Sequence, residues 1–315
     1  MPSKFLRDPM LVASIAIIVS SILYLVFSFL PRPAVSVGIN VLEEYVKAVT
    51  HLNKSSTAIA KRLAGFVADP GVSIGETYVN KDRIRIYLAN ITSIYGSQET
   101  FFAKVASNYL LIADASIDTL QALQIANRSV DTLKEALSLL AMCRVNDALN
   151  RFSVVEEDVT KAIENLSQAL DNLQKVNTSL IAENHVPAVN MSRRRIESSL
   201  NSLLNAYILM KIAEMYRDEM ETLCTNTTTL PIQTLQQLEN EIKNVKPTGP
   251  LSPDISNTQN TLITLINKAI QQQQGQGGGR ESCPCSSQHG GQGQVGQHSE
   301  GQGGGAGYAP PESDD

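Results

Sequence analysis

The feature that most constrains this chain is a run without a charged side chain near its start, from residue 10 to residue 30. A helix rises about 1.5 Å per residue, so this run spans roughly 31 Å, which matches the hydrocarbon core of a bilayer. Asp8 is a candidate N-cap, Pro9 fits the first helical position, and two prolines end the run. The sequence therefore predicts a transmembrane helix over residues 9–31.

A cleaved signal peptide is the alternative interpretation of this run. Signal peptides have a shorter apolar region of roughly 7–15 residues, with small residues at the cleavage site, whereas "LPRPA" follows here. The longer run favours an uncleaved signal anchor. Lys4 and Arg7 precede the run, Arg32 follows it, and the next basic residue is Lys47. The positive-inside rule therefore favours a cytoplasmic N-terminus at residues 1–8 and an extracytoplasmic body.

Asn-x-Ser/Thr sequons support an extracytoplasmic location. Seven occur, against about three expected by chance for this composition. A helical surface rich in Ser, Thr and Asn also generates sequons by accident, and that interpretation stays open. Asn177 falls on an apolar stripe, so it is not counted among the candidates. The candidate glycosylation sites are Asn53, Asn90, Asn127, Asn165, Asn190 and Asn226.

The body of the chain lacks the turn residues that a β-rich domain needs. Between residues 34 and 230 the only prolines are Pro70 and Pro187, and glycine is concentrated near the C-terminal end. The predicted fold class is all-α, an elongated antiparallel helical bundle with coiled-coil-like stripes. The predicted organisation is a cytoplasmic N-terminus at 1–8, a transmembrane helix at 9–31, an extracytoplasmic bundle at 35–245, a linker at 246–252, a C-terminal helix at 253–274 and a disordered Gln/Gly-rich tail at 275–315.

Two long segments carry apolar residues at alternating spacings of three and four, which is typical of coiled-coil-like helices. The stripes fit either packing within one chain or an intermolecular coiled coil. Short breaks between long helices favour packing within one chain. The stripes are Leu42, Tyr45, Val49, Leu52, Ser56, Ile59, Leu63 and Phe66, then Val159, Ile163, Leu166, Leu170, Leu173, Asn177 and Leu180.

Local signals predict several helix boundaries. Residues 76–95 alternate like a strand in "RIRIYL" but also fit a helical stripe, and a helix is predicted because a lone strand would have no partner. Ser97 is a candidate N-cap for a helix from about 98 to 126, and Ser129 for the helix after it. "SVVE" at 153–156 matches a capping box, which either opens a helix or lies inside one.

Cys143 and Cys224 are candidates for a disulfide. They lie on predicted helices on either side of Pro187, which ends the second stripe. In an oxidising compartment their bond would close a loop of about 80 residues and stabilise the fold by about 4 kcal/mol in the chain-entropy model. Two independently buried thiols are the alternative.

The tail carries the other two cysteines in "SCPCSSQHGGQGQVGQH". Cys283, Cys285, His289 and His298 are ligand types for zinc or copper, but structural zinc sites place more than one residue between paired cysteines. The two cysteines are also candidates for a disulfide or for cross-linking neighbouring chains. A tail without a defined site is the third interpretation. "GQGQVG" lacks the flanking strand and helix of a phosphate-binding loop.

The remaining charged and titratable motifs do not point to catalysis. The basic run Arg193–Arg195 opens a predicted helix, where it fits an acidic partner, an anionic surface or, as favoured here, a solvated helix face. His51 and His185 have no carboxylate or cysteine beside them in sequence, and the usual nucleophile, zinc-protease and P-loop motifs are absent from the sequence. We expect no enzymatic activity, no catalytic residue and no cofactor.

Composition narrows the function further. The net charge of −5 argues against a general nucleic-acid binder. We expect a non-enzymatic, membrane-anchored extracytoplasmic scaffold, stalk or adhesion protein of the cell surface. Its expected partners are the lipid membrane, other membrane or surface proteins and, through the stripes or tail cysteines, further copies of the chain. The alternative is an extracytoplasmic sensor or ligand-binding bundle that acts through a membrane partner.

Overall fold

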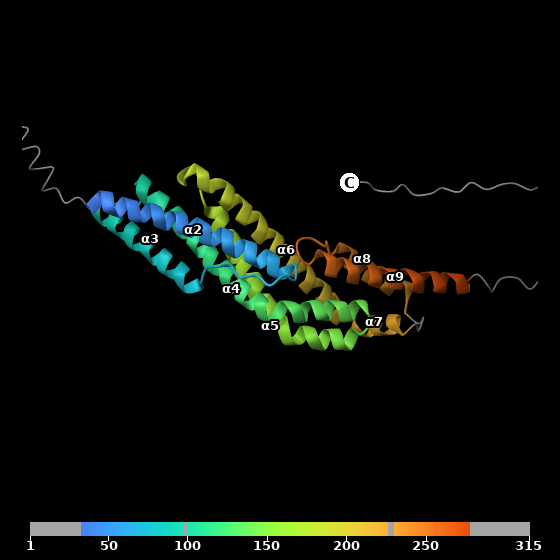
Figure 1. The fold of residues 1–315 in the computed structure, drawn as a ribbon. Coiled ribbons are helices and arrows are strands. Elements are labelled where there is room, and N and C mark those ends of the chain that lie inside the picture. Colours follow the sequence, from blue (N-terminus) through green and yellow to red (C-terminus); the bar gives the residue numbers. More distant parts are fainter. Residues whose placement is uncertain (1–32, 97–99, 226–229, 278–315) are drawn as a thin grey trace, which may run out of the picture. The chain divides into compact units, whose positions relative to one another are not determined.

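The computed structural model describes residues 33–96, 100–225 and 230–277, and all regular structure in these ranges is helical (Figure 1). The predicted all-α class and helical bundle are confirmed for this part of the chain. The predicted transmembrane helix at 9–31 and nearly all of the predicted tail at 275–315 lie outside it. Within the described ranges, no helix combines the length and the hydropathy needed to cross a bilayer.

Contacts place the helices described below in one unit that ends at Gln276, apart from Gly277, the last residue of α9. Two single 3-10 turns, η2 and η3, connect α5 to α6. The elements are α2 (Pro33–Leu63), α3 (Ile74–Tyr95), α4 (Phe101–Ala141), α5 (Val145–Lys175), η2 (Thr178–Leu180), η3 (Glu183–His185), α6 (Val186–Met215), α7 (Arg217–Cys224), α8 (Ile232–Asn244) and α9 (Ser252–Gly277).

Successive helices from α2 to α6 alternate in direction (Figure 1). α4 and α5 form a hairpin across the short turn at residues 142–144. α2 runs parallel to α4, because Tyr45 stacks on Tyr109 near the start of both helices and Arg62 pairs with Asp131 at 2.6 Å further along. A strictly antiparallel bundle would not contain this contact. It arises because α3 returns the chain along α2 before α4 begins.

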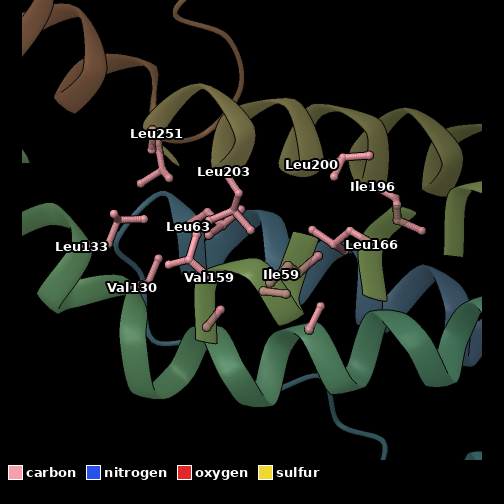
Figure 2. Close-up of a cluster of buried hydrophobic side chains, with 14 of the residues drawn as sticks. Ile59, Leu63, Val130, Leu133, Val159, Leu166, Ile196, Leu200, Leu203 and Leu251 are labelled. Atoms are coloured by element: carbon pink, nitrogen blue, oxygen red, sulfur yellow. The ribbon is translucent and has the colours of Figure 1, made fainter. Parts of the chain in front are cut away.

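α2, α4, α5 and α6 surround a continuous apolar core, and α3 packs against α2 and α4. Figure 2 shows the middle of this core, where side chains of the four helices meet the residue that precedes α9. Each fully buried Leu or Ile contributes about 1.5–3 kcal/mol relative to an exposed one. The labelled side chains are Ile59, Leu63, Val130, Leu133, Val159, Leu166, Ile196, Leu200, Leu203 and Leu251.

The first predicted stripe is buried from Tyr45 to Leu63 but not at Leu42, which is 63% exposed. At this end of α2 the covered face is the one toward α3, and it carries Val41 and Glu44 instead. The spacing within one helix cannot show from which side the next helix will approach. The stripe spacing therefore predicted the buried residues from Tyr45 to Leu63 and wrongly included Leu42 at the start of the stripe.

α2 also ends earlier than the sequence predicts. Gly65 has φ of +96°, a left-handed conformation that favours glycine, and it turns the chain directly after Leu63. Phe66, the last residue of the predicted stripe, therefore lies past the helix and is 65% exposed.

Ser129 does not begin a helix, contrary to prediction. It lies inside α4, where its hydroxyl donates to the carbonyl of Ile125 at 2.9 Å. The break comes at Cys143, which has φ of +61° and is the only non-glycine residue of the described ranges with positive φ. Ser153 likewise lies inside α5. Of the two alternatives for "SVVE", a helix start or a helix interior, the structure shows the helix interior.

The helix start at α3 is a capping box that the sequence prediction did not use. The Ser73 hydroxyl accepts from the Glu76 amide at 3.1 Å, and the Glu76 carboxylate accepts from the Ser73 amide at 3.0 Å. The predicted helix, not the alternating strand, is therefore correct for this segment. Thr100 caps α4 by accepting from the Ala103 amide at 3.3 Å, whereas Ser97, the predicted cap, lies outside the described residues.

α5 ends at Lys175, before the predicted end of its stripe. Residues 176–185 form a connection with two 3-10 turns, so Asn177 and Leu180 are not part of a helical stripe. Pro187 lies in the first turn of α6, which begins at Val186, and does not break α5.

The predicted linker at 246–252 is packed closely against α6. The amide of Leu251 donates to the Ser202 hydroxyl at 2.7 Å, and Asn205 donates to the carbonyl of Lys246 at 2.7 Å. Gly249 has φ of +71°, and a Cβ at this position would clash with the carbonyl oxygen of Ser198. The segment is therefore an ordered connection in which one position requires glycine.

Candidate functional site

A buried carboxylate lies between α2 and α3. Glu44 is 6% exposed, although its neighbours in sequence Leu42 and Glu43 are exposed. Its Oε2 accepts from Asn80 at 2.8 Å, and its Oε1 accepts from Arg83 at 2.8 Å and from Lys47 at 3.1 Å. Asn80 also donates to the carbonyl of Glu44 at 2.8 Å. Glu44, Asn80 and Arg83 therefore link α2 to α3.

The charge on Glu44 is supported by its neighbours. Burial raises the pKa of this carboxyl group, but the hydrogen bonds from Asn80, Arg83 and Lys47 together lower it by more. The net pKa therefore lies below the ordinary value. Glu44 is therefore ionised at neutral pH. Because both oxygens already accept hydrogen bonds, this carboxylate is poorly placed to act as a base or a metal ligand.

An open groove runs beside this carboxylate, and we name it the α2–α3 groove. Its volume is about 470 Å³. Apolar side chains continue from it over the outer side of α3, where Ile86 is 60% and Val79 is 53% exposed. The mixture of apolar surface with one guanidinium suits contact with another protein. The lining residues are Val41, Glu43, Glu44, Arg83, Ile86, Tyr87 and Asn90.

The histidines take part in structural contacts. Tyr45 and Tyr109 stack with ring centroids 3.9 Å apart. The Tyr109 oxygen lies 2.8 Å from Nδ1 of His185 and accepts from the amide of Ala182 at 3.0 Å. Burial lowers the pKa of His185 and raises the pKa of Tyr109. A neutral imidazole can therefore accept a hydrogen bond from the phenol, and the contact holds the 176–185 connection on α4.

His51 is also half-buried and lies 3.4 Å from the hydroxyl of Thr77, across the α2–α3 contact. Burial lowers its pKa. It is far along the sequence from His185, and the two histidines contact different helices. The structure does not bring the two histidines into one constellation.

Cys143 and Cys224 are joined as a disulfide in the structure, with Cα atoms 5.3 Å apart. Cys224 is the last residue of α7, but Cys143 lies in the turn between α4 and α5, not on a helix as predicted. The bond attaches α7 to this turn. Its formation in the cell stays a prediction.

The candidate sequons fall on different parts of the bundle. Asn90 and Asn127 are exposed, whereas Asn53, Asn165 and Asn190 are half-buried, and Asn226 lies outside the described residues. Asn177, which the sequence prediction set aside, is exposed in the connection between α5 and α6. Knowledge of where α5 ends would have kept it among the candidates.

Two residues of the basic run do not form the solvated face that the sequence favours. Arg193 donates to the carbonyl of Leu173 on α5, and Arg195 donates to Asn53 on α2 at 2.8 Å. These two guanidinium groups therefore join α6 to its neighbours. Arg194 is exposed between them.

The tail candidates Cys283, Cys285, His289 and His298 lie outside the described residues. Among the residues that the structure describes, no group of three His, Cys, Asp or Glu side chains is arranged to hold a metal ion. Comparison with protein-family models, with curated proteins and with solved structures finds no significant similarity to this chain. Its function must therefore be argued from its own residues.

Proposed function

We propose that the chain is a non-enzymatic, membrane-anchored helical scaffold of the cell surface, with α3 as a contact surface for another membrane or surface protein. The observation that carries this proposal is that α3 bears apolar side chains on its outer side as well as on its packed side. Its packed side carries Ile84 and Ile91 against the bundle. Its exposed apolar side chains are Tyr78, Val79, Ile86, Ile94 and Tyr95.

An ordinary surface helix keeps polar residues on the side away from its core. Isolated exposed apolar residues need no explanation, but several on one helix beside an open groove are typical of an interaction site. The core of the bundle is apolar and continuous, so it does not need these residues. Display of an interaction surface on a packed helical body accounts for both features.

The anchor rests on the uncharged run at residues 10–30. The extracytoplasmic side is supported by Lys4 and Arg7 before the run and by the geometry of the Cys143–Cys224 pair, since disulfides persist mainly in oxidising compartments.

A sensor that binds a small ligand is the second candidate, and the α2–α3 groove is what favours it. Arg83 and Glu44 line the groove, but they bind each other at 2.8 Å. A ligand would have to break this contact and would remain open to solvent. Small-molecule sites usually enclose most of their ligand, so the groove supports a protein contact better.

Cross-linking in intact cells tests the contact surface. We expect a Val79→Lys, Ile86→Lys double variant to lose the cross-linked species that the native chain forms, because two buried cations would oppose the contact. Val154→Lys is the matched control, since Val154 is 75% exposed on α5. Unchanged cross-linking in the double variant, with circular dichroism showing an intact fold, would rule out this surface.

Topology is tested separately. We expect the full chain to remain in the membrane fraction after alkaline carbonate treatment, and a tag placed after residue 277 to be degraded by protease added outside intact cells. A tag that resists the protease until the cells are lysed would contradict the extracytoplasmic location.

A further inference from the structure

The sequon Asn177-Thr178-Ser179 differs from the other described sequons in its backbone. Asn53, Asn90, Asn127, Asn165 and Asn190 all lie within α-helices. Asn177 follows the end of α5 at Lys175 and precedes the 3-10 turn η2. Among the residues that the structure describes, it is the only sequon asparagine outside an α-helix.

The local hydrogen bonds arrange the side chain of Asn177 as an acceptor for a glycan. Its side-chain Oδ1 accepts from the backbone amide of Ser179 at 3.0 Å and from the Ser179 hydroxyl at 2.8 Å. Both residues are exposed. The Asn177 Nδ2 makes no hydrogen bond within the described ranges. The asparagine and the serine that define the sequon therefore already lie in contact.

The main chain at Asn177 is held against the bundle while its side chain is exposed. The backbone amide of Asn177 donates to the Oδ1 of Asn108 on α4 at 2.6 Å. Further along the connection, the amide of Ala182 donates to Tyr109 at 3.0 Å. The segment is therefore an ordered surface loop, the setting in which a sequon can be reached without unfolding.

Three of the five helical sequons do not offer this access, because their hydroxyl residues Ser55, Ser129 and Ser192 are buried. In the sequon of Asn127, Ser129 is 3% exposed and its hydroxyl donates to Ile125. In the sequon of Asn53, Ser55 is fully buried and its hydroxyl donates to Leu52 at 3.1 Å. An enzyme that must contact both the amide and the hydroxyl would have to open these helices, which costs the free energy of local unfolding.

We propose that, among the sequons in the described part of the chain, Asn177 is the one that is N-glycosylated in the folded protein. The co-substrate is an oligosaccharide linked through phosphate to a polyprenyl lipid, and an oligosaccharyltransferase catalyses the step. The Asn177 Nδ2 attacks the anomeric carbon and forms a C–N bond, while the bond from that carbon to the phosphate oxygen breaks. The lipid phosphate leaves, and the amide gives one proton to a base of the transferase.

This inference depends on the proposed function, because the donor and the transferase act outside the cytoplasm. Its test uses the full chain expressed in its native host and purified from membranes, with intact mass and glycopeptide mapping as readouts. Ser179→Ala removes the sequon and keeps Asn177, whereas Ser179→Thr keeps both the sequon and the hydroxyl. Asn127→Gln is the control at an exposed helical sequon.

We expect one glycan on the peptide that contains Asn177, lost in Ser179→Ala and retained in Ser179→Thr and Asn127→Gln. A glycan on helical sequons with an unmodified Asn177 would overturn the inference and leave the extracytoplasmic location standing. An unmodified chain with an intact Cys143–Cys224 bond would do the same. An unmodified chain in which both cysteines are free thiols would overturn the inference and the proposed location together.

Discussion

Asp118 of α4 accepts a hydrogen bond from Asn172 of α5 at 3.0 Å, where these two helices pack together. Asp114 lies one turn earlier on α4 and pairs with Lys81 of α3. Burial and the charge of Asp114 raise the pKa of Asp118 to about 6, while Asn172 and Lys81 oppose this shift. The fold therefore holds a carboxyl group that binds a proton more readily than an ordinary aspartate does.

This pKa makes the stability of the bundle depend on pH in an unusual direction. The folded pKa lies above the unfolded value, so the folded state binds more protons between roughly pH 4 and pH 6. The contribution of Asp118 to the free energy of unfolding is most favourable below pH 4 and is lost as the pH rises through 6. We expect Asp118→Asn to increase the free energy of unfolding by about 1–2 kcal/mol at pH 7.5 and by little at pH 4.

Urea denaturation of the full chain at both pH values measures this difference. Asp171→Asn is the control, because Asp171 pairs with Lys175 on the outside of α5. Equal effects of Asp118→Asn at the two pH values would show that the carboxyl group is not perturbed.

The second prediction concerns the Cys143–Cys224 disulfide. A Cys143→Ser, Cys224→Ser variant should lose about 4 kcal/mol of unfolding free energy, because the unfolded chain gains the freedom that the closed loop removes. Thiol titration of the denatured, unreduced native chain should detect neither of these two cysteines. Two reactive thiols at these positions, or an unchanged stability in the variant, would contradict the prediction.

The backbone at Cys143 allows a sharper comparison. Its φ of +61° is unfavourable for a residue with a Cβ and acceptable for glycine. Cys143→Gly, Cys224→Ser should therefore be more stable than Cys143→Ser, Cys224→Ser by about 1 kcal/mol. The same urea titration compares the pair, and a less stable glycine variant would show that the turn changes conformation without the disulfide.

Gly249 provides the third prediction. Its left-handed φ and its approach to the Ser198 carbonyl leave no room for a Cβ. Gly249→Ala should cost about 2 kcal/mol or more, because the connection must move away from α6. Gly96→Ala is the control: Gly96 has a similar φ of +68° but open space around it, so it should cost about 1 kcal/mol. Equal losses would show that strain alone, and not the close contact, determines the effect.

The fourth prediction compares neighbouring glutamates on α2. Glu44→Gln should cost about 2 kcal/mol at pH 7, since it removes the charge that Arg83 and Lys47 bind between two helices. Glu43→Gln should cost only a few tenths of a kcal/mol, because Glu43 is exposed and pairs with Lys47 at the surface. Thermal unfolding of the two variants checks the difference, and similar losses would refute the structural importance of the buried carboxylate.

The stripe spacing predicted much of the fold. It located the buried sides of α2 and α5, including Ile59, Leu63 and Leu166. Apolar side chains at heptad spacing must face a partner wherever that partner lies, so the signal survives without knowledge of the tertiary structure. The spacing did not show which helices pack against each other, because the parallel packing of α2 on α4 depends on the path of α3.

Helix boundaries were predicted less well for a physical reason. Serine hydroxyls can bind backbone carbonyls inside helices as well as cap helix starts, and Ser129 does the former. Ser73 with Glu76 had the stronger signal, since the sequence contains both halves of a capping box, and it could have been found.

No pattern in the sequence indicated that Glu44 is buried. A glutamate beside a lysine on a helix reads as exposed until a second helix supplies Asn80 and Arg83. The groove that these residues line was therefore not predictable from the spacing of α2 alone.

The bond between Cys143 and Cys224 also determines what a single proteolytic cut can do. The bond encloses α5, α6 and most of α7, together with the 176–185 connection, which is the longest stretch outside the α-helices within that loop. One cleavage anywhere between the two cysteines would leave both fragments covalently joined, with the packed helices still holding them in register. A nicked molecule would then migrate as one band until a reductant separated it, so a protease in the surroundings would need two cuts, or a reducing environment, to release a fragment of this loop.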